Sequence, residues 1–224
     1  MNPTKLVIAL DGPAGAGKST VAKLTALELG LTLLDTGAMY RCVGLACIRR
    51  SICLDDPKKT AELGEALTIS FLPGDPQRVL LDGEDVTEAI RTPEVSQAAS
   101  IVSTHSAVRR DLVRRQKEMV AGGGCILEGR DTTTVVAPEA AVKVFLTASV
   151  EERARRRWLE LMDKGGSQSL QEVVLDVISR DYRDYTRSDS PLQLGEDVTL
   201  METFALTPQQ VAEKITQLAR SAGF

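Results

Sequence analysis

The sequence contains one histidine, one asparagine and one tryptophan among its 224 residues. A single histidine, His105, cannot form a histidine-rich metal cluster, and it makes a Ser-His-Asp triad a poor hypothesis. The only asparagine, Asn2, is followed by Pro3. The N-K-x-D segment of guanine-specific GTPases is therefore absent, and so is an L-S-G-G-Q-like segment typical of ABC-type ATPases.

Cysteine and long apolar runs are also scarce. The four cysteines are Cys42, Cys47, Cys53 and Cys125. Because they form no C-x-x-C pair, free thiols in a reducing cytosol are a better interpretation than disulfides or a zinc site. The apolar run at the N-terminus, Leu6 to Leu10, is too short for a signal peptide or a membrane span. We therefore expect a cytoplasmic protein with no membrane partner.

The charge balance is acidic, but arginine is concentrated in one part of the chain. The net charge is −4, which argues against a nucleic-acid partner. Arginine outnumbers lysine by 18 to 9, and 12 of the arginines fall between Arg109 and Arg187. Because the planar guanidinium captures phosphate in a bidentate manner, this pattern indicates a small anionic ligand.

Strand-like and helix-like segments alternate along residues 1–224, which predicts one α/β domain with a parallel sheet covered by helices on both faces. The predicted strands are Lys5 to Leu10, Leu31 to Leu34, Cys125 to Glu128, Val142 to Leu146 and Val198 to Glu202. The predicted helices are Lys18 to Leu29, Ala38 to Arg49, Glu94 to Val120, Glu151 to Met162 and Pro208 to Ala219.

Two segments depart from this alternation. Leu67 to Ile90 has strand periodicity on both sides of Pro73-Gly74-Asp75-Pro76, and again around Asp82-Gly83. This predicts a small antiparallel insert at about residues 60–92. Arginine-rich helices at about residues 151–190 are interrupted at Gly165-Gly166, which is typical of a hinged lid.

A phosphate-binding loop follows the first predicted strand. Residues 12–19 match G-x-x-x-x-G-K-[S/T] and are followed directly by a predicted helix. Glycines let backbone N–H groups curl around a phosphate, and the helix N-terminus attracts the anion. Lys18 is expected to reach the β- and γ-phosphates, and the Ser19 hydroxyl to bind Mg²⁺. The nucleotide-binding residues are Gly12, Pro13, Ala14, Gly15, Ala16, Gly17, Lys18, Ser19 and Thr20.

Further segments resemble the bacterial cytidylate kinases, a branch of the nucleoside monophosphate kinase family. They are Leu34-Asp35-Thr36-Gly37-Ala38-Met39-Tyr40-Arg41, Gly83-Glu84-Asp85-Val86 with Ile90-Arg91-Thr92, Gly129-Arg130-Asp131, and Arg180-Asp181-x-x-Asp184-x-x-Arg187 followed by Pro191-Leu192. Together with the phosphate loop they cover nearly the whole chain. The resemblance implies ATP as phosphate donor, CMP and dCMP as acceptors, and Mg²⁺ as cofactor.

The resemblance also implies roles for individual residues. The catalytic set would be Lys18, Arg130, Arg157 and Arg187. The acceptor would contact Thr36, Tyr40, Arg41, Ser100, Arg109, Arg130, Asp131, Arg180, Asp184 and Arg187. Among these, Asp131 and Arg109 would select cytosine, since a carboxylate accepts from its amino group and an arginine donates to its ring acceptors. Two positions depart from the usual family pattern: Glu128 stands in place of Asp, and Thr133 in place of Gly.

Helical spacing alone leaves alternatives open for the arginine groups. Arg153, Arg156 and Arg157 share one helix face, which fits either a lid over phosphates or a solvated helix paired with glutamates at 151, 152 and 160. A helix through residues 180–187 would place Asp184 between the guanidiniums of Arg180 and Arg187. Asp184 would then either accept from ribose hydroxyls, as the resemblance implies, or belong to a row of surface ion pairs.

The helix predicted for residues 94–120 carries four arginines. By the resemblance, Arg109 is expected to contact the nucleotide base of the acceptor. Arg110, Arg114 and Arg115 are expected in solvent. Its apolar side chains are expected in the core: Val102, Val108, Leu112 and Met119.

Two other functions remain open at this point. One is a kinase for UMP or for a non-nucleotide metabolite, and the other is a nucleotide-gated regulatory protein without transfer activity. The set Lys18, Arg41, Arg130 and Arg187 argues against the second. We expect a monomer.

Overall fold

The computed structural model describes residues 5–72, 74, 77–163 and 165–224. The described residues form two compact units. The first unit takes its residues from Met1–Leu34, Val120–Thr186 and Ser190–Phe224, and the second from Asp35–Met119 and Arg187–Asp189.

A five-stranded sheet with the order β2-β6-β1-β7-β8 forms the centre of the first unit. Its strands are β1 (Val7–Asp11), β2 (Thr32–Asp35, whose last residue belongs to the second unit), β6 (Cys125–Glu128), β7 (Val142–Thr147) and β8 (Thr199–Glu202). Strand β1 runs parallel to both neighbours, and Ile8 is in register with Ile126 and Val142. The sheet confirms the predicted strands to within two residues, because the central strands are apolar runs buried on both faces.

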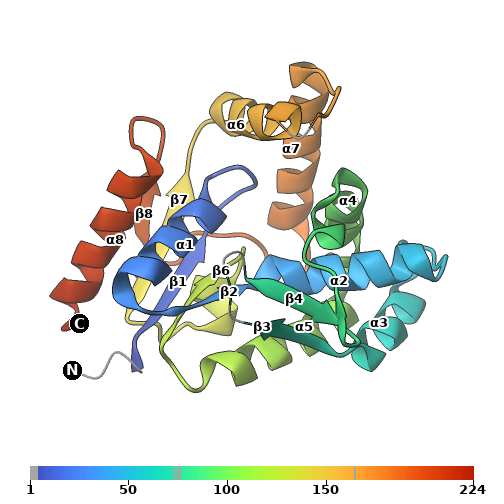
Figure 1. The fold of residues 1–224 in the computed structure, drawn as a ribbon, viewed down its shortest axis with the longest axis horizontal. Helices are drawn as coiled ribbons and strands as arrows, with labels where there is room; N and C mark the ends of the chain where they lie inside the picture. Colours follow the sequence, from blue (N-terminus) through green and yellow to red (C-terminus); the bar gives the residue numbers. More distant parts are fainter. Residues whose placement is uncertain (1–4, 73, 75–76, 164) are drawn as a thin grey trace. The chain divides into compact units, whose positions relative to one another are not determined.

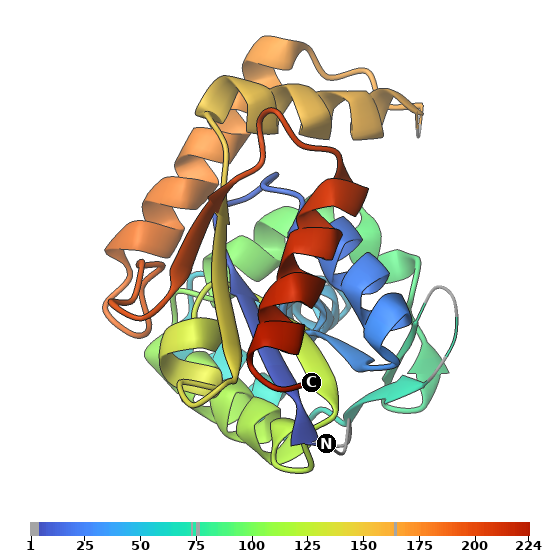
Figure 2. The same cartoon turned by 90° about the vertical axis from the view of Figure 1, so that its left-hand side faces the viewer.

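Helices α1 (Lys18–Leu29) and α8 (Pro208–Ser221) pack side by side against one face of this sheet (Figure 1, Figure 2). Val21 of α1 and Ile215 of α8 are buried in one apolar cluster with Ile8. The parallel sheet and its flanking helices confirm the predicted α/β class. No helix within the described ranges is long and apolar enough to cross a membrane.

The predicted lid is a helical hairpin in the first unit. Helices α6 (Val150–Asp163) and α7 (Leu170–Thr186) pack against each other (Figure 2). Between them, the Gly165 and Gly166 amides donate to carbonyls of the last turn of α6, and Gly165 has a φ of 78°. The break at these glycines is therefore confirmed.

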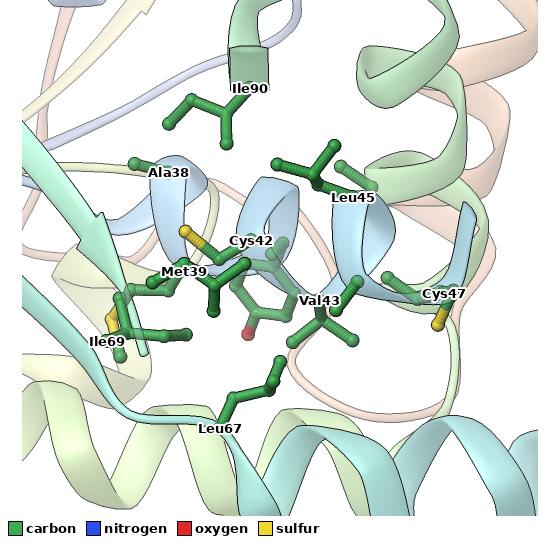
Figure 3. Close-up of a cluster of buried hydrophobic side chains, with 14 of the residues drawn as sticks. Ala38, Met39, Cys42, Val43, Leu45, Cys47, Leu67, Ile69 and Ile90 are labelled. Atoms are coloured by element: carbon green, nitrogen blue, oxygen red, sulfur yellow. The ribbon is translucent and has the colours of Figure 1, made fainter. Parts of the chain in front are cut away.

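Among the residues that the structure describes, the second unit contains the antiparallel insert and four helices. Its elements are α2 (Thr36–Arg49), α3 (Pro57–Ala66), β3 (Ile69–Leu72), β4 (Arg78–Leu81), β5 (Glu84–Asp85), the 3-10 turn η2 (Ala89–Arg91), α4 (Pro93–Val102) and most of α5 (Ser106–Val120). The side chains of α2, β3 and β4 share one apolar cluster, part of which is drawn in Figure 3.

The insert has the predicted antiparallel arrangement. Ile69 pairs with Leu81 and Phe71 with Val79, which are the alternating apolar positions of the sequence. The turn at Asp82-Gly83 is confirmed, since both residues have positive φ, as tight hairpin turns require. Within the other predicted turn, residues 73, 75 and 76 lie outside the described residues.

One helix prediction and one core prediction were wrong, and one helix was not predicted. The single helix predicted over residues 94–120 is broken into α4 and α5, because the Ser103 and Thr104 hydroxyls bond to carbonyls three residues earlier and compete with the helical amides. Met119 is 36% exposed and is not core. Helix α3 was missed, although Asp56 before Pro57 is a typical start signal and caps it.

Candidate active site

The phosphate loop joins the end of β1 to the start of α1, as predicted. Three of its glycines have positive φ: Gly12, Gly15 and Gly17. A Cβ on Gly12 would lie 2.1 Å from the carbonyl oxygen of Leu146, on β7. The loop can therefore pass this close to the sheet only because glycine has no side chain.

Lys18 lies under the loop with 6% of its surface exposed. Its Nζ donates to the carbonyl oxygens of Gly12 and Pro13 at 2.8 and 2.9 Å. Burial, together with the positive charge of Arg130, lowers the pKa of Lys18 to about 7. An incoming phosphate would supply the missing negative charge and favour the ammonium form.

The Ser19 hydroxyl, at the first turn of α1, lies beside the end of β6. It donates to Oε2 of Glu128 at 2.8 Å. A hydroxyl and a carboxylate are the oxygen donors that Mg²⁺ prefers, so these residues fit the expected ion. Within the described ranges no group of three or more His, Cys, Asp or Glu side chains could hold a metal by itself.

A fully buried carboxylate holds the turn that follows β6. Asp11 accepts from the amides of Thr132 and Thr133 at 2.8 and 2.7 Å, and from their hydroxyls at 2.8 and 2.6 Å. Burial raises the pKa of Asp11. Four donors on one carboxylate set the π-helical turn Thr132–Val136, and this turn directly follows Arg130 and Asp131.

Arg130 forms an ion pair with helix α7, part of the predicted lid. Its Nε donates to Oδ2 of Asp184 at 2.8 Å, and both side chains are largely buried. The charges of Arg130 and Arg180 lower the pKa of Lys18, and those of Glu128 and Asp184 raise it. Asp131 is also buried.

The helix predicted for residues 180–187 ends one residue early. Helix α7 stops at Thr186, and Arg187, which belongs to the second unit, is buried. The expectation of one helical row through Arg180, Asp184 and Arg187 is therefore corrected. The backbone carbonyl of Asp184 accepts from the Leu192 amide at 2.8 Å, which turns the chain back toward the sheet.

The three lid arginines have three different environments. Arg153 is buried and bonds to the phosphate loop, with Nη1 2.9 Å from the carbonyl oxygen of Ala14. Arg156 donates to Glu152 and to Thr203. Arg157 pairs with Glu160 at 2.8 Å and keeps about a quarter of its side chain exposed. Pairing with Glu152 and Glu160, one of the two alternatives for this face, is thus present for Arg156 and Arg157.

In the second unit, Arg41 and Arg109 are both held by hydrogen bonds. Arg41 donates to the carbonyl of Ile90 and to the Ser96 hydroxyl, at 3.1 and 2.5 Å. Arg109 is 1% exposed and donates to the Ser103 carbonyl at 3.2 Å. Its guanidinium lies 5.2 Å from the ring centre of Tyr40, within cation–π range.

The burial of the remaining predicted residues of this unit agrees with expectation for some of them and not for others. Thr36 and Ser100 are buried, and Arg110 and Arg114 are exposed. Arg115 was wrongly expected in solvent. It is 17% exposed and donates to three carbonyls where α3 ends, at Gly64, Glu65 and Leu67.

Sequence reasoning missed Asp11, Ser96 and the loop contact of Arg153. A signal existed only for Asp11, which is a charged residue at the end of an apolar strand, directly before the loop. Ser96 and Arg153 contact residues 55 and 139 positions away, and no local pattern contains such pairs.

Comparison with known proteins gives consistent matches over almost the full length. A family model described as cytidylate kinase matches residues 8–221. A cytidylate kinase of Desulforamulus reducens is 49% identical over 208 residues, covering 93% of this chain and 94% of the relative. One of Bacillus cytotoxicus is 44% identical over 219 residues, 97% of both chains. An uncharacterized protein from Eubacterium ventriosum shares the fold, with a TM-score of 0.52 at 11% identity over 97% of this chain and 99% of that one.

Proposed function

Because the chain belongs to the cytidylate kinase family, we propose that it transfers the γ-phosphate of ATP to CMP or dCMP and releases ADP with CDP or dCDP. The family assigns the acceptor. The observation that supports phosphate transfer is the buried Lys18 at the glycine-rich loop, whose pKa is lowered by burial and by the charge of Arg130. Such a site is built to receive the charged phosphates of a nucleoside triphosphate.

The chemistry needs positive charge more than it needs a base. ATP brings about four negative charges and a monophosphate about two, and two unit charges 4 Å apart repel by about 4 kcal/mol at an effective dielectric of 20. An oxygen of the acceptor phosphate, already anionic, attacks the γ-phosphorus while the bond to the β,γ-bridging oxygen breaks. Lys18, Arg130, Arg157 and Arg187 neutralise the charge that moves during this step.

Ser19 and Glu128 would hold Mg²⁺ near the β- and γ-phosphates. When bound, the ion supplies further neutralisation of phosphate charge. The sole histidine has no place in this scheme, since its Nε2 lies 2.7 Å from the carbonyl oxygen of Leu54 in the second unit.

The acceptor residues are proposed from the family pattern. Arg41 and Arg130 grip the acceptor phosphate, while Arg109, Asp131 and Ser100 face the base. The remaining contacts, to ribose and phosphates, come from Thr36, Tyr40, Arg180, Asp184 and Arg187. The existing bonds of Arg41 and the ring contact of Arg109 support these roles, because they limit the freedom of each guanidinium before a ligand binds.

We also propose that residues 1–224 act as one kinase domain, with the acceptor-binding insert at about 60–92 and the lid at about 151–190. The protein would act as a cytoplasmic monomer on small nucleotides, without nucleic-acid or membrane partners. Size-exclusion chromatography with light scattering tests the monomer.

A substrate panel tests the proposed activity. Purified protein with ATP and Mg²⁺ is given CMP, dCMP, UMP or AMP, and ADP formation is followed by a coupled assay. We expect the highest kcat/KM with CMP and dCMP. A preference for UMP or AMP would assign another acceptor, and ATP binding without ADP formation would indicate a regulatory protein.

A further inference from the structure

Two side chains of the lid helices hold both backbone polar groups of one phosphate-loop residue. Oδ1 of Asp181, on α7, accepts from the Ala14 amide at 3.1 Å. Nη1 of Arg153, on α6, donates to the Ala14 carbonyl at 2.9 Å. The backbone at Ala14 is therefore oriented by residues that are far from it in the sequence.

The two side chains also bind each other in a buried setting. Nη1 of Arg153 lies 2.5 Å from Oδ2 of Asp181, and Nε of Arg153 donates to the Ala148 carbonyl at 3.0 Å. Both residues are more than nine-tenths buried. A buried ion pair of this kind is tolerated when hydrogen bonds satisfy its remaining polar atoms, and it is disrupted strongly when one partner is removed.

The first turn of α6 also packs directly on the loop backbone. A Cβ on Gly15 would lie 2.7 Å from the carbonyl oxygen of Arg153. Because Gly15 has a φ of 76°, the close approach and the backbone conformation both require glycine there. The position of Arg153 and the shape of the loop are thus linked by packing as well as by hydrogen bonds.

We propose that Arg153 and Asp181 are positioning residues for the phosphate loop. They fix the backbone at Ala14, so that the loop amides that follow are oriented for the phosphates of ATP before ATP arrives. They act through the loop and contact no substrate. The inference rests on the proposed function only in requiring that this loop binds a nucleotide, and it assigns the lid a part in donor binding as well as in closure.

An opposite role for Asp181 can be separated by experiment. A carboxylate on a loop amide could compete with phosphate for that amide, and its removal would then tighten ATP binding. The geometry favours positioning, because Arg153 neutralises the carboxylate at 2.5 Å and also holds the Ala14 carbonyl. The set is a closed and neutral ring, with no charge left to repel a nucleotide.

The test compares Asp181→Ala, Asp181→Asn, Arg153→Ala and the double Ala variant with the wild type. Affinity for ADP is measured by calorimetry without acceptor, and KM is measured separately for ATP and CMP. Two exposed residues of the same helices serve as controls: Arg155→Ala on α6 and Asp176→Ala on α7. Melting curves show which variants fold.

We expect both single Ala variants to weaken ADP binding and raise the KM for ATP by roughly ten- to a hundredfold, since small displacements of a binding group have effects of this size. The KM for CMP should change less than about twofold. The double variant should be no worse than the worse single variant, because both act on one residue. Both controls should match the wild type.

Tighter ADP binding by Asp181→Ala would overturn the proposal in favour of competition. Equal changes in the two KM values, unchanged ADP binding or additive effects in the double variant would also overturn it. If Asp181→Ala does not fold, Asp181→Asn decides, since its side chain has only one acceptor oxygen and must lose the bond either to the Ala14 amide or to Arg153. Unchanged ADP affinity in that variant would reject the role. None of these outcomes depends on which acceptor the wild type prefers, so a wrong acceptor and a wrong positioning role are distinguishable.

Discussion

The Ser19 hydroxyl and the Glu128 carboxylate form a 2.8 Å hydrogen bond across 109 residues of sequence. It links the first turn of the helix after the phosphate loop to the end of the neighbouring strand β6. The longer side chain at position 128, where the family usually has aspartate, thus reaches directly to the hydroxyl proposed to hold Mg²⁺.

Glu128→Gln should increase the Mg²⁺ concentration needed for half-maximal rate by about tenfold or more, as removal of a partner of a metal ligand does. The expected cause is loss of the negative charge beside Ser19. Glu128→Asp keeps the charge and should shift the requirement less. Rates are measured against free Mg²⁺ at saturating CMP. Superimposable Mg²⁺ curves for wild type and Glu128→Gln would show that this carboxylate has no part in ion binding.

Lys18→Met should abolish phosphate transfer while the protein still folds, because the loop backbone needs no lysine charge to form. The expected result is a kcat below a tenth of wild type with an unchanged far-UV circular dichroism spectrum. A variant that retained more activity than this would show that Lys18 is not the phosphate clamp.

The same variant tests the effect of burying Lys18. Its pKa is about 7 in the fold and its ordinary value is 10.5, so between these values the unfolded chain binds more protons and folding stability rises with pH. The free-energy cost of burying the protonated Lys18 side chain therefore reaches its full value below pH 7. Without nucleotide, Lys18→Met should therefore melt above wild type at pH 6 to 7, with a difference that shrinks toward pH 10. A difference constant over this range would contradict the lowered pKa.

The parts of the site that could be predicted are those written in neighbouring residues. The strand, loop and helix from Val7 to Leu29 were predictable because spacing and glycine chemistry act locally. The helix break at Gly165-Gly166 was predictable for the same reason. The hydrogen bonds from Thr132 and Thr133 to Asp11 were not predictable, since the partners are about 120 residues apart and only the fold brings them together.

Competition between side-chain hydroxyls and backbone amides explains why one helix was predicted where the structure has α4 and α5. The apolar pattern of residues 94–120 continues across Ser103 and Thr104, so periodicity alone predicts one helix. The side-chain hydroxyls end α4 by bonding to its last carbonyls. Apolar periodicity contains no information about such bonds, although two adjacent hydroxyl residues are a warning of them.

Thr133→Val should lower the free energy of unfolding by about 1.5–3 kcal/mol, the range for a hydrogen bond to a charged group. The lost contact is the 2.6 Å bond from the Thr133 hydroxyl to Asp11. Thr134→Val is the matched control, because the buried Thr134 hydroxyl has no hydrogen-bond partner among the described residues. Urea unfolding measures both. Equal losses in the two variants would show that the Asp11 bond does not stabilise this turn.

Asp131→Ala should lower kcat/KM for CMP much more than for UMP. The cytosine amino group donates to a carboxylate, whereas the uracil oxygen at the same place is repelled by it, and a good contact of this kind contributes about 1–3 kcal/mol of discrimination. Kinetics with both acceptors at saturating ATP measure the effect. An equal loss on CMP and UMP would indicate that Asp131 only supports the turn that Asp11 holds.

The sole tryptophan offers a probe of lid closure. The indole of Trp158, on α6, donates to the Gln168 carbonyl at 3.0 Å and packs against the buried side chains that join α6 to α7. It is half-buried within the lid hairpin, so movement of the hairpin as one body preserves these contacts and changes only what faces the exposed side of the ring. Closure over nucleotides excludes water, which would otherwise accept the phosphate.

We therefore expect an ATP analogue together with CMP to shift Trp158 emission by more than the sum of the two separate shifts. Each ligand is titrated alone and then in the presence of the other, with Trp158→Phe as the blank. Arg155→Ala, on the same helix, checks that a surface change near the probe leaves the pattern intact. Purely additive shifts, or none at saturation, would argue against closure of this segment, because a lid that waits for both nucleotides must respond to the pair differently from either one.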